Sequence, residues 1–339
     1  MWSMSQKVMF GILVFLCVNY LFQLALDKTT EFQTSPLQEG FTDGVAGATP
    51  TPTPTGAKGA DGDNSLYTWT SDSQLIYDDF YAGVYDQLSN QADRTAAKLA
   101  YCVNQWKKDS PNLKEWSVLD AGCGTGHAVG TLAKVGVGRV VGMDNAPAMV
   151  RQAERVVIPS LKLNDQQQQA IRWKQDSLVN PGAANPSEFS HAVCMYFTFY
   201  YLQNQEEFFR HMNHWIKPGG KLVVEVVNKH KFDPILESAS PFLAFSLQKY
   251  SKERIKKSKV TFDKFDYEAE FVLTDPKAEF YETFRFKNNH VRRQKHVFTM
   301  PNISEIVEMG KRAGWHYQGY QDLQPVGFEY GYLLFFEKK

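Results

Sequence analysis

The sequence predicts an α/β fold with a parallel sheet flanked by helices, and two observations lead to this prediction. From residue 66 onward, short apolar runs alternate with segments of helical spacing. In particular, the apolar run 116–121 is followed by a glycine-rich loop, a helical pattern over 128–135 and a second apolar run over 139–144. A strand, a helix and a second strand in this order form a unit whose strands lie parallel. With 339 residues, 43% of them hydrophobic, the chain can bury such a core.

Two segments precede the predicted fold. Residues 8–26 carry no charge and, at a rise of about 1.5 Å per residue, nearly span a ~30 Å hydrocarbon core. Residues 1–28 are therefore expected to form an N-terminal transmembrane helix, with a cleaved signal peptide or a buried helix as the alternatives. Residues 29–65 are rich in Gly, Pro and Thr and are expected to form a disordered linker. Residues 66–339 remain as the folded domain.

The glycine-rich loop indicates the kind of ligand that the fold binds. Glycines at the first strand–helix turn let the backbone approach a ligand closely, and Asp144, at the tip of the second strand, suits ribose hydroxyls. Dinucleotide folds bind a pyrophosphate at this turn with a G-x-G-x-x-G pattern. Here Gly122, Gly124 and Gly126 form G-x-G-x-G, and Asp120 before them would repel a pyrophosphate but attract an ammonium group. S-adenosylmethionine carries an ammonium group, a ribose and an adenine but no phosphate, so it fits the loop better.

From about residue 77 to the C-terminus, the sequence resembles the class I S-adenosylmethionine-dependent methyltransferases. The resemblance rests on the loop 120–126, on Asp144, on the stretch 171–178 and on the Pro-Gly-Gly turn within 215–228. It implies a Rossmann-like, mostly parallel sheet of seven strands flanked by helices. The fourth strand would lie at 190–196, and the last two strands at 315–320 and 331–336. Asn204 and Glu207 mark the start of the helix before the Pro-Gly-Gly turn as N-cap and N3 residues.

The resemblance also implies a set of cofactor-binding residues. The loop would hold the methionine part, Asp144 the ribose, and residues after the second and third strands the adenine. Tyr81 would cover the cofactor. The expected cofactor-binding residues are Asp120, Ala121, Gly122, Cys123, Gly124, Gly126, Asp144, Asn145, Met149, Asp176, Ser177, Tyr196, Phe197 and Tyr81.

The segment 77–88 resembles the N-terminal helix that covers the cofactor in this family. Tyr77, Tyr81 and Tyr85 recur at four-residue spacing and would share one helix face, either in ordinary core packing or as a cover over the cofactor. Tyr81 is one of two candidate catalytic residues. The other is His230, which follows the fifth strand and would be either a general base or a solvated loop residue.

An insertion over about 229–300 would roof the site for the methyl acceptor, as such insertions often do in this family. The alternating stretches 267–273 and 279–286 predict an antiparallel hairpin. Between 290 and 296, basic residues could bind a carboxylate or phosphate, or could keep an exposed strand edge soluble. The lysine-rich run 249–259 is expected to be a solvated helix face or a contact for anionic lipid headgroups. The candidate acceptor-binding residues are Tyr201, Arg292 and Arg293.

The absence of several sequence motifs argues against some methyl acceptors and against a metal site. No N-P-P-Y follows the fourth strand and no Pro-Cys nucleophile is present, so nucleic acid is not expected as a partner. The four cysteines form no C-x-x-C, and no acidic cluster marks the strand ends, so no metal site is expected. The favoured function is a membrane-tethered S-adenosylmethionine-dependent methyltransferase acting on a small molecule. A protein side-chain methyltransferase and a non-catalytic interaction module are the alternatives.

The expected location follows from the N-terminal segment. A transmembrane helix there would make membrane lipid a partner and the protein single-pass. Lys7 before the span would direct the domain away from the cytosol by the positive-inside rule. The cofactor is made in the cytosol, however, so the catalytic domain is expected on the cytosolic side.

Overall fold

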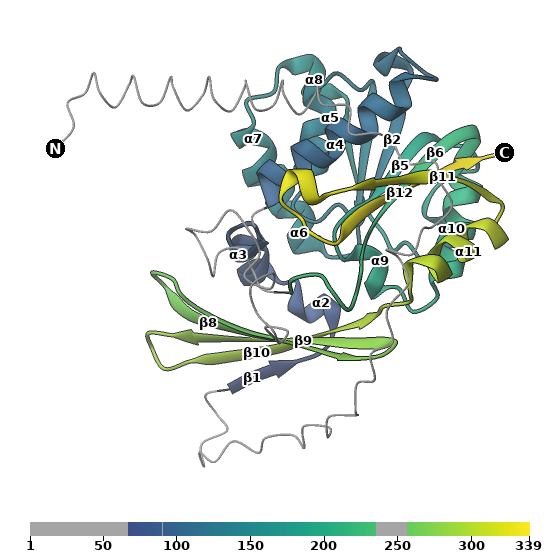
Figure 1. Ribbon diagram of the computed structural model, residues 1–339. Coiled ribbons are helices and arrows are strands. Elements are labelled where there is room, and N and C mark those ends of the chain that lie inside the picture. The colour runs from purple at the N-terminus through teal and green to yellow at the C-terminus, as the bar shows by residue number, and fades with distance from the viewer. Residues whose placement is uncertain (1–66, 90, 235–255) are drawn as a thin grey trace.

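The structure, a computed structural model, describes residues 67–89, 91–234 and 256–339. Two sheets organise these residues, one large and one small (Figure 1). Helices cover the large sheet, and the small sheet lies beneath it in the view of Figure 1, with α2 and α3 between them.

In the described part of the chain, seven strands form the large sheet in the order β11-β12-β6-β5-β2-β3-β4. The five strands from β6 to β4 pair in parallel, whereas β12 and β11 add antiparallel to the β6 edge. The seven-stranded, mostly parallel sheet expected from the sequence is therefore confirmed. The strands are β2 (Ser117–Ala121), β3 (Arg139–Asp144), β4 (Ile171–Gln175), β5 (Phe189–Cys194), β6 (Ile216–Val227), β11 (Trp315–Asp322) and β12 (Gly331–Lys338).

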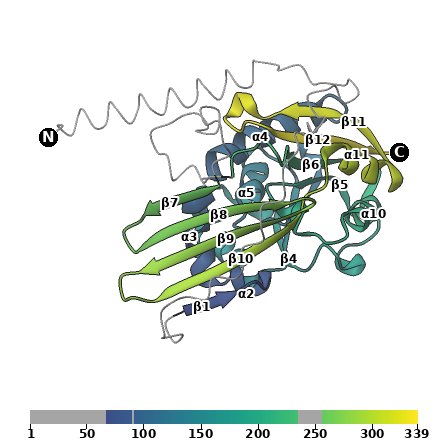
Figure 2. The same cartoon turned by 60° about the horizontal axis from the view of Figure 1, so that its bottom comes forward.

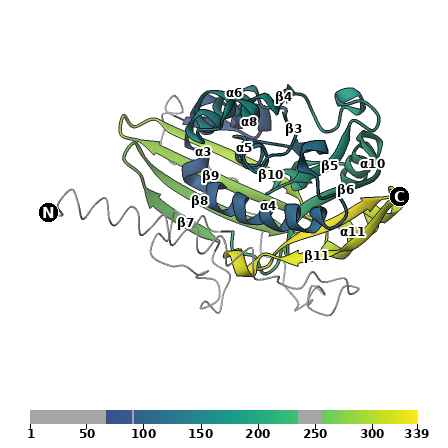
Figure 3. The ribbon, with the colours of Figure 1, turned by 90° about the horizontal axis from the view of Figure 1, so that it is seen from above.

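Both faces of the large sheet are buried, which explains why its central strands read as continuous apolar runs. Alternate residues of β2 and β3 point to opposite faces of the sheet and belong to two separate hydrophobic cores. Val118 and Val140 pack with α4 and α5, whereas Leu119 and Val141 pack on the side of α10 and α11. Figure 3 shows these two helix pairs apart from each other. The helices are α4 (Gln91–Lys107), α5 (His127–Lys134), α10 (Gln205–Trp215) and α11 (Ile303–Arg312).

Shorter helices complete the layers. They are α2 (Ser73–Ile76), α3 (Asp79–Ser89), α6 (Pro147–Gln152), α7 (Ile158–Ser160), α8 (Asp165–Gln169) and α9 (Thr198–Tyr201). A π-helical turn over Ala153–Val157 joins α6 to α7.

Two local predictions concern helix ends. The side chain of Asn204 caps α10 by accepting a hydrogen bond from the backbone N–H of Glu207 at 3.1 Å, as predicted. The predicted cover helix begins later than expected: α3 starts at Asp79, and Tyr77 instead follows the end of α2. The three tyrosines still gather, because the ring centroids of Tyr77, Tyr81 and Tyr85 lie 5.4–6.0 Å apart.

The small sheet contains five described strands in the order β1-β10-β9-β8-β7 (Figure 2). The pairing of β8 with β9 confirms the predicted hairpin, and β1 is the one strand that pairs in parallel, with β10. Alternate residues of β8 and β9 are buried and pack on α2 and α3, so the sheet has an inward and an outward face. The strands are β1 (Tyr67–Thr70), β7 (Lys257–Thr261), β8 (Phe265–Thr274), β9 (Lys277–Phe286) and β10 (Val291–Thr299).

The small sheet corrects two expectations about basic residues. The run 290–296 is not an exposed edge, because β10 lies between β1 and β9. The described end of the run 249–259 is not helical: Lys257 and Lys259 lie on the edge strand β7, where they pair with Glu270 and Glu268 at 3.1 Å. The rest of that run lies outside the described residues.

The expected membrane location is also corrected. Among residues 67–89, 91–234 and 256–339, no helix is both long enough and apolar enough to cross a membrane. The segments 1–28 and 29–65, on which the expected transmembrane helix and linker depend, lie outside the described residues. The expectation of a single-pass membrane protein with a cytosolic catalytic domain therefore does not stand.

Candidate active site

The glycine loop turns sharply between the end of β2 and the start of α5. The backbone N–H groups of Gly122 and Cys123 donate to the carbonyl of Met143 at 2.8 and 3.0 Å, which holds the loop against β3. Asp144, at the tip of β3, accepts from the N–H of Gly124 at 2.9 Å. The carboxyl ends of the parallel strands thus bring the loop and Asp144 together, as expected for the ligand edge of such a sheet.

Two glycines of the loop are required for different reasons. Gly122 has φ +78°, and a Cβ atom there would lie 2.2 Å from Cγ2 of Thr198, the first residue of α9. Gly126 has φ +83°, and a Cβ atom there would meet Trp173 at 2.7 Å and Ala153 at 2.8 Å. Gly122 therefore keeps space beside the ligand site, whereas Gly126 allows α5 to pack closely on its neighbours.

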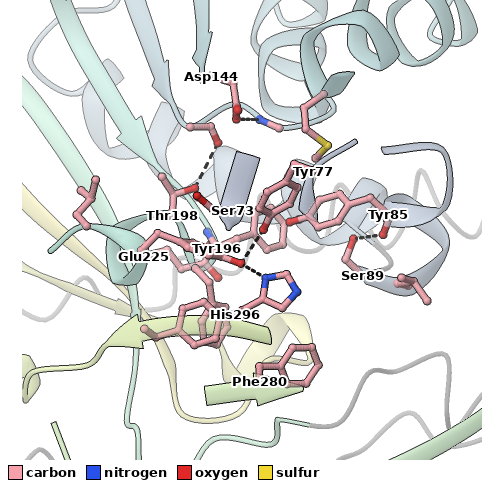
Figure 4. A pocket seen from close by; sticks show the side chains of 18 of the residues that line it. Ser73, Tyr77, Tyr85, Ser89, Asp144, Tyr196, Thr198, Glu225, Phe280 and His296 are labelled. Carbon is pink, nitrogen blue, oxygen red and sulfur yellow. Dashed lines mark hydrogen bonds between the residues drawn. The ribbon is translucent and has the colours of Figure 1, made fainter. Parts of the chain in front are cut away.

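One cavity of about 310 Å³ joins the glycine loop to the inward face of the small sheet (Figure 4). In Figure 4, Asp144 lies at one side of the cavity and Phe280 at the other, with Tyr77 and His296 between them. The expected cofactor-binding residues that line the cavity are Tyr81, Gly122, Gly124, Asp144, Asn145, Met149, Asp176, Ser177, Tyr196 and Phe197. The expected residues Asp120, Ala121, Cys123 and Gly126 do not line it.

On the small sheet, the buried carboxylate of Glu282 accepts four hydrogen bonds. Oε1 accepts from Tyr267 at 2.5 Å, and Oε2 accepts from Tyr81 at 2.8 Å and from Gln294 and His296 at 2.5 Å. Burial would raise the pKa of Glu282, but His296 and the donated hydrogen bonds outweigh it and lower the pKa below its ordinary value. Glu282 is therefore ionised, and His296 must donate through Nε2–H, because a carboxylate has no hydrogen to give.

A second buried pair lies on the other side of the cavity. Lys98 on α4 and Glu225 on β6 are 1% and 2% exposed, and their Nζ and Oε1 atoms are 2.6 Å apart. The other oxygen of Glu225 accepts from the backbone N–H of Tyr196 at 2.9 Å. Lys98 Nζ also lies 4.1 Å from the centroid of the Tyr196 ring. Tyr196 has φ +55°, a strained conformation for a residue with a side chain, and this pair helps to hold it there.

Residues 87–318, more than half of the chain, match the family described as methyltransferase domain. The chain belongs to this methyltransferase family.

The methyltransferase resembles one curated relative over part of its length. It is 28% identical over 119 residues to the protein named ubiquinone biosynthesis O-methyltransferase, mitochondrial, of Dictyostelium discoideum. The match covers 34% of this chain and 37% of that protein, so it spans little more than a third of the relative.

Solved structures share the fold of the methyltransferase. An S-adenosylmethionine-dependent methyltransferase from Clostridium acetobutylicum has a TM-score of 0.55 at 16% identity, covering 76% of this chain and 98% of that one. The CcbJ methyltransferase from Streptomyces caelestis has the same TM-score and identity, covering 79% and 99%. CalS10 from Micromonospora echinaspora, solved with S-adenosylmethionine bound, has a TM-score of 0.51 at 16% identity, covering 77% and 96%. The family match shows that the chain is a methyltransferase, and the solved structures show that it has the fold of enzymes that use S-adenosylmethionine.

The residues present fit this cofactor. Asp120 is buried, and its Oδ2 has no hydrogen-bond partner in the described part of the chain. An unpaired buried carboxyl oxygen suits the ammonium group of the methionine part, although Asp120 does not line the cavity. Burial raises the pKa of Asp144, and the N–H groups of Ala146 and Gly124 offset part of that shift. We expect the ribose hydroxyls to bind this carboxyl group.

Replacing Asp120 with Asn should change stability and cofactor binding in opposite directions. Burial, and then Asp144, raise the pKa of Asp120 from its ordinary 3.8 to about 7. An acid whose pKa is higher in the folded state loses stability as the pH rises between the two values. Between about pH 5 and pH 8, the wild type should therefore lose roughly 2–3 kcal/mol more than Asp120→Asn.

The measurement is denaturant unfolding of the cofactor-free protein at both pH values, with calorimetry of S-adenosylmethionine binding. We expect Asp120→Asn to bind the cofactor more weakly, because the ammonium group loses a charged partner. Equal pH dependence in both proteins, or undiminished cofactor affinity in Asp120→Asn, would contradict the role given to Asp120.

Three expected site residues are corrected. His230 is exposed, does not line the cavity, and has Asp275 as its nearest acidic partner at 3.9 Å, so it is not placed as a base. Arg292 is buried outside the cavity, where its guanidinium pairs with Asp78 at 2.7 Å. Arg293 lies on the outward face of β10, because neighbouring strand residues point to opposite faces. By contrast, the expected acceptor residue Tyr201 does line the cavity.

Several cavity residues were not among the expected ones, although some carried a signal. Glu225 interrupts the apolar run of β6, and Glu282 occupies an inward position of β9 between Phe280 and Phe284. A charged residue at an apolar position of a strand is rarely buried without a partner, so each indicated a buried pair. Lys98, Thr198, Glu225 and Glu282 are among the missed residues, whereas His296 was expected only as one of the basic residues of 290–296.

Proposed function

We propose that this enzyme methylates a hydroxyl oxygen of a small, largely apolar molecule bound under the small sheet. The observation that carries the proposal is the single cavity that joins the glycine loop to the inward face of that sheet. The wall on the sheet side contains the aromatic rings of Phe271, Phe280 and Phe298, and its polar groups are Glu282 and His296. An acceptor there would lie against rings and hydrogen-bond at one end, as small ligands in apolar pockets do.

The contacts that hold α3 over the small sheet support a small acceptor. Tyr81 on α3 donates to Glu282, and Asp78, just before α3, pairs with Arg292. Because Tyr81, Glu282 and Arg292 are buried, a protein acceptor is the weaker alternative. An oxygen atom as the methylated position is supported by the name of the Dictyostelium discoideum relative, an O-methyltransferase.

The chemistry divides between the cofactor and the chain. When bound, S-adenosylmethionine supplies a methyl group activated on a sulfonium sulfur. The chain has to align the acceptor with it, exclude water and take the hydroxyl proton. Phe280 and Phe298 would align a flat acceptor, and α3 with the small sheet would exclude water.

An activity screen tests the proposal. The purified protein is incubated with methyl-labelled S-adenosylmethionine and with phenol, catechol or para-nitrophenol, each paired with an amine of similar shape, and with a Lys- and Arg-containing peptide. Label should enter the hydroxyl compounds, and mass spectrometry should show methyl ethers. Label found only in amines, or only in the peptide, would contradict the proposed acceptor.

A pair of neighbouring residues provides the control. Phe280 lines the cavity, whereas Tyr281 points to the outward face of the same strand. Phe280→Ala should raise KM for the hydroxyl compounds by roughly tenfold, because burying an aromatic ring contributes at least about 1.5 kcal/mol. Tyr281→Ala should leave KM unchanged.

A further inference from the structure

A series of hydrogen bonds crosses the cavity. Because Glu282 is ionised, it accepts from Nε2–H of His296. When the His296 ring is neutral, its Nδ1 accepts from the hydroxyl of Tyr201. Tyr201 then accepts from Tyr77, whose hydroxyl oxygen lies 2.8 Å from its own. With the ring neutral, every hydrogen in the series points toward Glu282.

The series begins beside the expected cofactor site. Tyr77 packs against the cluster of Ala146 and Met149, which directly follows Asp144 on β3. Tyr77, Tyr201, His296 and Glu282 all line the cavity. The hydroxyl oxygen of Tyr77 can still accept a hydrogen bond, so an acceptor hydroxyl can join the series without breaking any bond in it. Figure 4 shows Tyr77 and His296 close together in the middle of the cavity.

We propose that Tyr77, Tyr201 and His296 form a proton relay that removes the hydroxyl proton of a phenol-type acceptor. This inference rests on the proposed function. The acceptor proton passes to the oxygen of Tyr77, the Tyr77 proton passes to Tyr201, and the Tyr201 proton passes to Nδ1 of His296. The electron pair of the acceptor O–H bond stays on the oxygen, which forms the new bond to the methyl carbon. The pair of the broken sulfur–carbon bond stays on sulfur, so S-adenosylhomocysteine leaves neutral.

The environment of each residue suits its part in the relay. Burial, followed by neighbouring tyrosines, raises the pKa of both Tyr77 and Tyr201 well above the usual range. These residues therefore pass protons as neutral hydroxyls and do not rest as phenolates. His296 is the group that ends up protonated, and the charge formed on its ring lies against the ionised Glu282 at 2.5 Å. After product release, the proton can return to solvent.

The test compares acceptors that differ in acidity. Phenol has a pKa near that of a tyrosine, about 10, and needs a base, whereas para-nitrophenol is already largely ionised at about pH 8. His296→Gln and Tyr201→Phe should lower kcat for phenol roughly 100- to 10,000-fold, the usual contribution of general-base catalysis. For para-nitrophenol the same variants should lose only a few-fold. A purely structural role would lower both rates equally.

Two controls and a measurement without turnover complete the test. His316→Gln on β11, where the side chain is exposed, and Tyr281→Phe on the outward face of β9 repeat the same substitutions away from the cavity and should keep wild-type rates. With S-adenosylhomocysteine bound, the visible absorbance of para-nitrophenol reports its ionisation below neutral pH. The wild type should bind it largely as the phenolate, and His296→Gln should bind it as the neutral phenol.

The outcomes separate the relay from the function on which it rests. If the wild type methylates amines but no phenol, the proposed function is wrong. If the wild type methylates phenol but the variants lose equal factors with both acceptors, the function stands and the relay is wrong. A wild type that leaves the ionisation of bound para-nitrophenol unchanged would also overturn the relay.

Discussion

Replacing Glu225 with Gln should lower the free energy of unfolding by about 3–5 kcal/mol, the usual cost of removing one partner from a buried ion pair. Lys98 would keep its place in the core without an opposite charge, since only 1% of its side chain is exposed. Burial already lowers the pKa of Lys98, and Glu225 is the main group that opposes this shift. The folded variant should therefore release the lysine proton, which the unfolded chain retains.

Denaturant unfolding at two pH values measures this effect. Because the unfolded state of Glu225→Gln binds more protons, its stability should rise with pH, and the deficit should shrink toward about pH 10. The double variant Lys98→Met with Glu225→Leu should recover most of the lost stability, because a buried ion pair can be replaced by apolar side chains.

An exposed pair is the matched control for the buried one. Glu308 and Lys311 on α11 lie 2.7 Å apart with about half of each side chain exposed. Glu308→Gln should change stability by less than about 1 kcal/mol. A loss of that small size in Glu225→Gln would show that Lys98 does not depend on Glu225.

Replacing Gly122 with Ala should weaken S-adenosylmethionine binding at least about 100-fold, the order expected when an active-site group shifts by about 1 Å. The new Cβ atom would lie 2.2 Å from Cγ2 and 2.7 Å from Oγ1 of Thr198, which lines the cavity. Relieving the clash requires the side chain of Thr198, the loop or α9 to shift, because even the Thr198 Cβ atom would lie only 3.0 Å away, and all of these contribute to the cofactor side of the cavity. The φ of +78° adds about 1–2 kcal/mol of backbone strain.

Gly219 is a control position that separates the effect of backbone strain from the effect of the clash with Thr198. It has φ +74°, but a Cβ atom there would meet nothing within 4 Å. Gly219→Ala should therefore lose a little stability and keep its cofactor affinity in calorimetry. Gly122→Ala combined with Thr198→Ala should regain part of the affinity, because the nearest remaining Thr198 atom, Cβ, lies 3.0 Å away. Wild-type affinity in Gly122→Ala alone would contradict the close approach.

The parts of the fold that the sequence predicts well are those that depend on neighbouring residues. The strand 139–144 was predicted with the bounds that β3 has, because its apolar run ends at a turn. The hairpin of β8 and β9 was predicted because alternation and a short turn lie within one stretch of chain. The glycine loop was recognised for the same reason: its residues are contiguous.

The small sheet as a whole could not be predicted because its pairing partners are distant in sequence. Strand β1 pairs with β10, and α3 covers the face on which His296 lies. Alternation in β10 separates Arg292, Gln294 and His296 from Arg293 and Lys295, but it does not say which face is covered. From the sequence alone, the alternation in β10 is the same whether His296 is buried or solvated. Only the position of α3 in the fold decides between the two.

Helix α3 is tied to both sides of the cavity, and this has a consequence for turnover. Toward the small sheet, Tyr81 of α3 donates a hydrogen bond to Glu282. Toward the glycine loop, Asp86 of α3 accepts a hydrogen bond from Thr125 at 2.6 Å. A movement that carries α3 along with the small sheet to release the product would also break its contact with the glycine loop. Spent cofactor and methylated product would then leave through the same opening. Such a gate favours one methyl group per encounter over repeated methylation of a retained acceptor.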